Sequence, residues 1–186
     1  GGGFASKKTC ITGAASVKGQ VMRAAGPMFN KMLEGAGASI ASMASSEVYA
    51  GLQTGVLTGV NTSSGSFVSF KIYEQVKCAT PPGQYGLWFM YEPILVSKKS
   101  FNALNAKQKA ALLAAGKKAE EYMFGQVAAL DKKMEDTYKA KGVKLAYMTE
   151  KDYNEWVEIA KKTSFKEFSA KVPAGASLIE KALAVK

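Results

Sequence analysis

Arg23 is the side chain of this sequence best suited to bind an anionic group specifically, because it is the only arginine among 25 basic residues. Its planar guanidinium presents a two-point fork of N–H donors that matches the two oxygens of a carboxylate. Arg23 lies in an apolar run, 20–25, and three explanations for it remain open at this point. The side chain pairs with an internal acid, reaches out to solvent, or binds a ligand.

Covalent catalysis finds no support in the sequence. The 186 residues include no histidine, which excludes a Ser-His-Asp triad, a Cys-His nucleophile and a histidine-ligated zinc site. No nucleophile and base stand at a suitable spacing, so we expect neither an enzyme nor a cofactor or metal site. The two cysteines, Cys10 and Cys78, lack CxxC spacing. One disulfide and two buried thiols both remain open for them.

The charged residues are dispersed. The chain carries 25 basic and 15 acidic residues, a formal net charge of +10, and its lysines often stand in pairs such as Lys117-Lys118. Such pairs are typical of solvated helix faces, so we expect no nucleic-acid partner. Apolar residues make up 47% of the chain, as in globular proteins. No run of about 18 apolar residues is present, so we expect no direct insertion into a membrane.

Strand and helix patterns alternate in the first 76 residues. Residues 1–19 show only one short β-type run, at 9–12. After it we expect three strands, each followed by a helix; the strands are 20–25, 38–43 and 56–60, and the helices 26–35, 45–55 and 67–76. This alternation favours parallel strands flanked by helices, an α/β fold.

The polar residues that follow these strands form a candidate ligand site. In a parallel sheet, ligands bind at the carboxyl ends of the strands. Arg23, Ser45 and the polar loop 61–65 all fall at such ends. We expect the side chains of Arg23, Asn61 and Thr62 to open on one common face, with Ser63 beside them.

The second half of the sequence is mainly helical. After the turn Pro81–Gly83, an apolar and aromatic strand is predicted at 87–97, interrupted by Pro93. A very long helix is predicted at 105–141, opened by Asn105 with Gln108 three residues on. A short strand at 143–148 and further helices, the first capped by Thr149, complete the chain.

Four blocks of the sequence resemble one protein family. Residues 46–59, SEVYAGLQTGVLTG, are similar to the S-E-V-Y-x-A-L-Q-T-G-V-x-D-G block of the periplasmic solute-binding subunits of TRAP (tripartite ATP-independent periplasmic) transporters. Three flanking blocks resemble segments of the same family in the same order; they are KGQVMR at 18–23, FKIYEQV at 70–76 and LVSKKSFNAL at 95–104.

The resemblance implies an architecture. It implies one lobe of a periplasmic-binding-protein-type (type II-like) fold, with a parallel-rich sheet flanked by helices, a long connecting helix and C-terminal helices. Residues 1–97 would form the α/β ligand-binding lobe with a crossing strand, and 98–186 the connecting helix and C-terminal helical segment. The match begins in the middle of such a protein, so the first lobe of the parent protein is expected to be absent from this chain.

The resemblance also implies a function. It implies a periplasmic, non-enzymatic receptor that captures a small organic acid for the membrane subunits of a TRAP transporter. The alternative is a ligand-sensing module of similar fold that is not coupled to transport. In the family, the arginine at the Arg23 position grips a ligand carboxylate.

Two departures and two further positions complete the expected site. Ser45 stands where the family often has an aromatic residue, and the family's ligand-binding Asn falls on Thr62, so Asn61 is expected to substitute for it. Trp88 or Phe89 is expected to floor the pocket, with core packing as the role of at least one of them. Glu92 lies where some members place a polar residue facing the cleft; it either meets a ligand amine or a cation there or is a satisfied or solvent-facing side chain, and both remain open.

Overall fold

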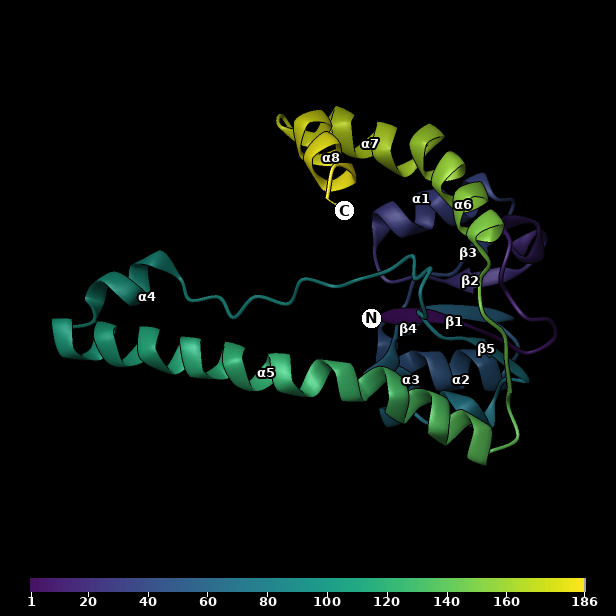
Figure 1. Ribbon diagram of the computed structural model, residues 1–186, viewed down its shortest axis with the longest axis horizontal. Helices are drawn as coiled ribbons and strands as arrows, with labels where there is room; N and C mark the ends of the chain where they lie inside the picture. Colours follow the sequence, from purple (N-terminus) through teal and green to yellow (C-terminus); the bar gives the residue numbers. More distant parts are fainter. Residues whose placement is uncertain (186) are drawn as a thin grey trace.

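The computed structural model describes residues 1–185 and contains a six-stranded sheet with helices on both faces (Figure 1). The strands are β1 (Gly2–Ser6), β2 (Val21–Arg23), β3 (Ser39–Ile40), β4 (Gly59–Ser63), β5 (Cys78–Thr80) and β6 (Lys144–Leu145). The α-helices are α1 (Pro27–Gly35), α2 (Val48–Gln53), α3 (Ser64–Ser69), α4 (Lys98–Ala103), α5 (Ala106–Ala140), α6 (Glu150–Lys162), α7 (Ser164–Lys171) and α8 (Gly175–Leu183). Three 3-10 turns complete the set, η1 (Ala14–Val17), η2 (Ser45–Glu47) and η3 (Ile72–Glu74).

The strand order in the sheet is β3-β2-β4-β1-β5-β6. Strands β3, β2 and β4 run parallel to one another, as do β5 and β6. The central strand β1 runs antiparallel to both of its neighbours, β4 and β5. The predicted α/β class, with a sheet rich in parallel pairs and flanked by helices, is therefore confirmed.

The central strand β1 was not expected from the sequence. The short strand predicted at 9–12 is wrong, because those residues form a loop, whereas the glycine-rich start of the chain pairs on both sides. Glycine has low strand propensity, but at these positions a larger residue would collide with its neighbours. A Cβ on Gly2 would strike the ring of Trp88, and one on Gly3 would strike the backbone oxygen of Thr80.

Strand β4 lies three residues later than predicted. The sequence predicted a strand at 56–60 and a polar loop from Asn61, but Asn61 and Thr62 lie within β4 and pair with β1. Pairing with β1 over five residues gives these polar residues a place in the sheet, which a propensity argument does not anticipate.

Two hydrophobic cores lie on opposite faces of the sheet. On one face, Phe4 stacks on Trp156 of α6 at 5.7 Å between ring centroids, beneath helices α1 and α6. On the other, Phe67 of α3 meets Tyr138 of α5 edge-on at 5.9 Å, beside α2. Figure 1 shows the helices that cover the two faces, α1 and α6 above the sheet and α2, α3 and α5 below it.

The predicted long helix is confirmed as α5, with the Asn105–Gln108 capping box at its start. Only its C-terminal part packs on the sheet, through Met134 and Tyr138. The predicted strand at 87–97 is wrong. Trp88 makes one isolated bridge to Gly2, and the residues after it run extended without a strand partner in the described part of the chain.

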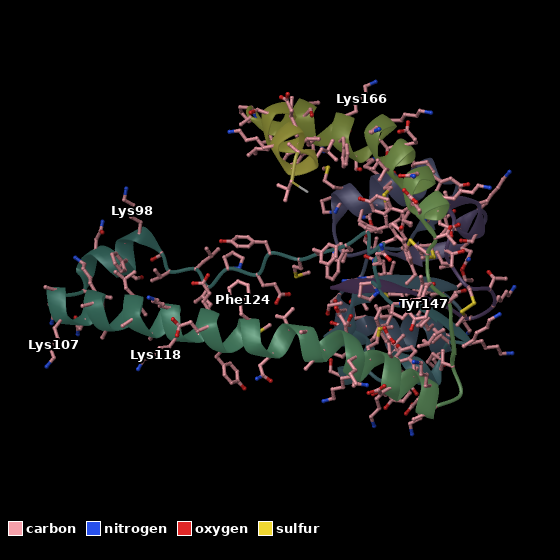
Figure 2. All side chains as sticks on the ribbon, viewed as in Figure 1. Lys98, Lys107, Lys118, Phe124, Tyr147 and Lys166 are labelled. Atoms are coloured by element: carbon pink, nitrogen blue, oxygen red, sulfur yellow. A yellow bond between two sulfur atoms is a disulfide. The ribbon has the colours of Figure 1, made fainter. Side chains whose placement is uncertain are left out.

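We call residues 89–130 the arm; it comprises this extended segment, α4 and the first two thirds of α5. Figure 1 shows the arm projecting away from the sheet, and no residue of it is buried. Its exposed large apolar side chains lie on both the extended segment and α5; they are Phe89, Met90, Tyr91, Ile94, Leu95, Val96, Leu112, Leu113, Tyr122, Met123 and Phe124. In Figure 2, Phe124 points from α5 towards the extended segment, whereas Lys107 and Lys118 point the opposite way.

Cys10 and Cys78 form a disulfide, with 5.1 Å between their Cα atoms. The choice that the sequence left open is therefore decided in favour of the bridge. It joins the loop after β1 to the start of β5, at the opposite end of the strands from Arg23.

Candidate ligand-binding site

The Arg23 side chain is held by three hydrogen bonds from its guanidinium, each made by a different nitrogen. Nε donates to the backbone oxygen of Met43 at 3.1 Å, Nη1 to the backbone oxygen of Asn61 at 3.1 Å, and Nη2 to Oγ of Ser45 at 2.9 Å. A guanidinium has five N–H groups. One N–H on each terminal nitrogen is therefore left without a partner in residues 1–185.

Arg23 is a buried cation without a counter-ion. Its residue is only 8% exposed, and no salt bridge within the described residues includes it. Burial alone lowers the pKa of its guanidinium, with no contribution from an acid, yet arginine stays charged in proteins. Of the three explanations that the sequence left open for Arg23, pairing with an internal acid is thus excluded within residues 1–185.

The segment 43–47 forms a turn that grips the guanidinium from one side. It supplies two of the three acceptors, the backbone of Met43 and the hydroxyl of Ser45. The turn is closed by Glu47, whose Oε2 accepts from the backbone N–H of Ala44 at 2.7 Å. Because β3 lies beside β2, this turn follows directly next to the carboxyl end of the strand that carries Arg23.

Arg23 and Thr62 share a face of the sheet, but Asn61 does not. Arg23 lies opposite Val60 in the parallel register, and side chains alternate along a strand. Asn61 therefore faces the other side, opposite Phe4. The expectation of one common face for all three side chains is wrong because the polar run lies inside a strand rather than in a loop.

The Asn61 side chain is occupied within the protein. Its Nδ2 donates to the backbone oxygen of Gly3 at 2.9 Å, and its Oδ1 accepts from the backbone N–H of Ala25 at 3.4 Å. These bonds tie the chain after β2 to the central strand β1. Asn61 thereby braces the end of the strand that presents Arg23. Thr62 is likewise buried.

Ser63, Trp88 and Glu92 line a separate groove of 610 Å³, together with residues of α3 and α5. The hydroxyl of Ser63 caps α3 by accepting from the backbone N–H of Ser66 at 3.1 Å. Trp88 is buried over Gly2, while Glu92 is exposed. Arg23 and Ser45 do not line this groove. Six of the seven predicted site residues therefore fall into two groups, Arg23 with Ser45 and Asn61, and Ser63 with Trp88 and Glu92, whereas Thr62 belongs to neither.

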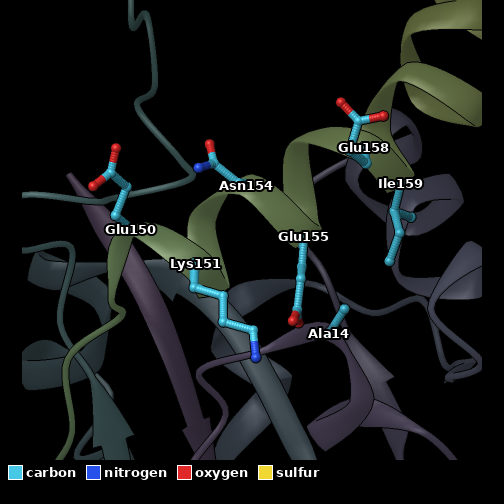
Figure 3. Close-up of a pocket in the computed structure, with 7 residues that line it drawn as sticks. All are labelled: Ala14, Glu150, Lys151, Asn154, Glu155, Glu158 and Ile159. Atoms are coloured by element: carbon cyan, nitrogen blue, oxygen red, sulfur yellow. The ribbon is translucent and has the colours of Figure 1, made fainter.

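A further hollow of 820 Å³ lies over the first turns of α6, far along the chain from these residues. Figure 3 shows that Glu155 points towards Ala14, whereas Glu150, Asn154 and Glu158 point to the other side of the helix. Because its acids diverge, this hollow has no common point at which they would meet a ligand.

Two of the three groups that hold Arg23 are backbone carbonyls, of Met43 and Asn61. Sequence reasoning missed both, because every residue type carries the same carbonyl and only the path of the chain aims it. The third, the Ser45 hydroxyl, was among the predicted residues, but as a ligand contact rather than a partner of Arg23.

Comparison with known sequences and structures gives a consistent result. Residues 3–171 match the family described as bacterial extracellular solute-binding protein, family 7. A solute-binding protein of Albidiferax ferrireducens is 32% identical over 178 residues, which are 96% of this chain and 53% of that protein. The four-block resemblance found in the sequence is confirmed.

Solved structures share the fold over the whole chain. A TRAP periplasmic solute-binding protein from Rhodoferax ferrireducens with bound malonate has a TM-score of 0.90 at 30% identity, covering 100% of this chain and 61% of its own. Another, from Sulfurospirillum deleyianum with bound succinate, has a TM-score of 0.83 at 24% identity, covering 100% of this chain and 60% of its own. The chain thus spans between half and two thirds of the length of these relatives.

Helices that combine enough length with enough apolar character to cross a membrane do not occur in residues 1–185.

Proposed function

Because the chain belongs to family 7 of the bacterial extracellular solute-binding proteins, we propose that it captures a small organic acid and holds the acid's carboxylate on Arg23. The family is one of binding proteins, so no covalent step is involved. The captured acid would be passed to the membrane subunits of a TRAP transporter.

The observation that carries this proposal is the unpaired, buried guanidinium of Arg23. A buried charge without a counter-ion is costly, and three hydrogen bonds to neutral oxygens hold the group in place without neutralising it. One N–H is left open on each terminal nitrogen, and a carboxylate of the ligand would accept from these two groups. A ligand carboxylate would supply the missing charge.

The relative with bound malonate supports a small acid as the ligand class. That protein is 30% identical to this chain over its whole length, and malonate presents a carboxylate at each end. We propose the same chemical class for this chain, with the Ser63–Trp88–Glu92 groove on the side of the ligand away from Arg23. Thr62 would line the pocket between Arg23 and this groove, and Asn61 would brace the strand behind it.

The arm supports a ligand site that is completed by a second lobe. The relatives are longer than this chain, and the arm exposes many large apolar side chains. Exposed apolar patches of this kind mark interfaces. We propose that a first lobe packs on the arm and closes over Arg23, which would exclude water and strengthen the contacts to the ligand.

The disulfide is consistent with a periplasmic location. Disulfides form and persist in oxidising compartments, of which the bacterial periplasm is one. The bridge between Cys10 and Cys78 therefore agrees with the extracytoplasmic place that we propose for this protein.

Replacement of Arg23 by lysine tests the proposal. Arg23→Lys keeps the charge but loses the two-point fork. We expect malonate affinity of the two-lobe protein, measured by calorimetric titration, to fall about ten-fold or more, since one charge-assisted hydrogen bond contributes about 1.5–3 kcal/mol. The matched control is Lys118→Arg, a charge-conserving change on the outer face of the arm, which should leave affinity unchanged.

The outcome that overturns the proposal is equally direct. If Arg23→Lys binds every tested carboxylate as tightly as the unaltered protein, Arg23 is a structural residue. The carboxylate receptor would then lack its central group.

A further inference from the structure

We infer that the extended segment of the arm, residues 89–96, is a β-strand whose partner is the stretch of chain that directly precedes Gly1 in the longer protein. The two stretches would pair antiparallel and form a ribbon that joins the sheet of this chain to the first lobe. The inference rests on the proposed function for the existence of that lobe, and it involves no ligand.

The pairing begins within the described chain. Gly2 and Trp88 form an antiparallel bridge, and the backbone N–H of Gly2 donates to the backbone oxygen of Trp88 at 3.2 Å. Figure 1 shows the N-terminus close to the point where the extended segment leaves the sheet. In an antiparallel pair, one step back along the first chain is one step forward along the second. A chain that enters β1 in line with the strand would therefore lie along Phe89 and the residues after it.

The extended segment alternates as a strand does. Trp88, Met90 and Glu92 line the groove of 610 Å³ next to α3 and α5. Phe89 instead lines a hollow of 450 Å³ formed with α1, α6 and α7. Side chains that point alternately to two faces are characteristic of a β-strand. Yet residues 89–96 are all exposed and have no strand partner within residues 1–185.

Pro93 is compatible with a partner in this register. Since Gly2 and Trp88 form a hydrogen-bonded pair, every second residue after Trp88 turns its N–H towards the partner. These residues are Met90, Glu92 and Ile94. Pro93 has no N–H to donate, but its position faces the opposite edge, so the ribbon loses no hydrogen bond. A register shifted by one residue would need a donor at Pro93.

Helix α5 covers one face of the proposed ribbon. Val127 and Leu130 of α5 line the same groove as Trp88 and Met90. A two-stranded ribbon alone is marginally stable in water, and packing against a helix stabilises it. An unpaired edge of apolar residues favours the addition of another strand. We assign that strand to the chain before Gly1, because the bridge to Trp88 already sets its direction.

Paired cysteines in the two-lobe protein test the register. Tyr91 would lie opposite the second residue before Gly1, at about 4.5 Å between Cα atoms, which is within the range of disulfides. Tyr91 is exposed, so Tyr91→Cys leaves the core of this chain intact. With a cysteine at that second position, it should form a bridge on mild oxidation. In the matched control the cysteine replaces the residue directly before Gly1, whose side chain would point to the opposite face, and we expect no bridge.

Three outcomes overturn the inference. Peptide mass spectrometry finds no bridge in the first variant, the control forms its bridge at equal or greater yield, or the bridge joins two molecules, as non-reducing electrophoresis would reveal. The last outcome would assign the extended segment to a second copy of the protein.

Amide exchange tests the pairing without a substitution. We expect the amides of Met90 and Glu92 to exchange at least about ten-fold more slowly in the two-lobe protein than in the 186-residue chain, because paired N–H groups exchange only when the structure opens. The amide of Phe4 is the control, since Phe4 pairs with Thr80 within this chain. Equal exchange of Met90 and Glu92 in the two proteins contradicts the ribbon.

Failure of this inference is distinguishable from failure of the proposed function. Loss of malonate affinity in Arg23→Lys, together with no bridge at Tyr91→Cys, retains the carboxylate receptor and overturns the ribbon. A bridge at Tyr91→Cys, together with unaltered affinity in Arg23→Lys, retains the ribbon and overturns the carboxylate receptor.

Discussion

The sheet and the helices packed on it, which we call the body, contain the same kinds of apolar residues as the arm. The two regions differ in how deeply these residues are buried. Tyr138 and Met134, in the last third of α5, lie in a core against α3. Phe124 and Met123, three turns earlier in the same helix, are exposed. A single helix therefore serves two environments, and its apolar residues alone do not tell which part is covered.

Helix α5 is longer than the body, that is, the sheet and the helices packed on it. Its first two thirds carry large exposed apolar side chains, of which Phe124 points towards the extended segment (Figure 2), as expected of a helix that has a partner. In this chain the partner is provided only at the C-terminal end. The proposed first lobe would bury the apolar side chains of the arm, as those of the body are already buried.

The largest expected difference concerns the free energy of unfolding, when an aromatic residue of the body or one of the arm is replaced by alanine. Trp156 is 0% exposed, stacks on Phe4, and donates from Nε1 to the backbone oxygen of Thr12 at 2.7 Å. Trp156→Ala should lower the free energy of unfolding by about 3–5 kcal/mol. Phe124→Ala, at a residue 74% exposed, should change it by less than about 0.5 kcal/mol.

Urea unfolding of the 186-residue chain, followed by circular dichroism, measures both changes. Comparable losses in the two variants would contradict the distinction between body and arm, because Phe124 would then contribute to the same core.

The disulfide provides the next contrast. It closes a loop with a sequence separation of 68 residues, all within the body. The double variant Cys10→Ser/Cys78→Ser should lower the free energy of unfolding by about 2–4 kcal/mol, chiefly by releasing the unfolded chain. Thermal unfolding with and without a reducing agent checks the size of the effect. Amide hydrogen exchange in α4 should be the same with and without the bridge, and an altered rate there would show that the arm depends on the body.

Two helix caps give the smallest contrast. Thr149 caps α6 in the body by accepting from the backbone N–H of Asp152, and Asn105 caps α5 in the arm by accepting from that of Gln108. Removal of either cap should lower the stability of the capped end of its helix by about 1 kcal/mol. Thr149→Ala should lower global stability, whereas Asn105→Ala should only increase amide exchange in the first turns of α5. A fall in global stability with Asn105→Ala would place the arm in the same cooperative unit as the body.

The elements with strong local signals were predictable. The capping box at Asn105 and the helix over the following 35 residues follow from spacing, since such pairs satisfy the first N–H groups of a helix whatever surrounds it. The same holds for the helix after Thr149. Arg23 could also be singled out, because an arginine within an apolar run has few physical explanations.

The elements that depend on distant partners were not predictable. Strand β1 begins with two glycines, and it is a strand because β4 and β5, which lie far along the chain, pair with it on both sides. Residues 87–97 have the composition of a strand, but no described strand lies beside most of them. Strand pairing supplies the hydrogen bonds that local propensity cannot.

The candidate site divides in the same way. Residue chemistry pointed to Arg23 and Ser45 as groups that bind an acid, because a guanidinium and a hydroxyl carry that capacity in any fold. Only the fold decided that Arg23 donates a hydrogen bond to Ser45 and that the backbone oxygens of Met43 and Asn61 hold the same guanidinium. The fold also decided that the Asn61 side chain faces the other side of the sheet. The direction of a carbonyl and the face of a strand residue follow from the path and register of the chain, since a shift of one residue in register reverses every side chain.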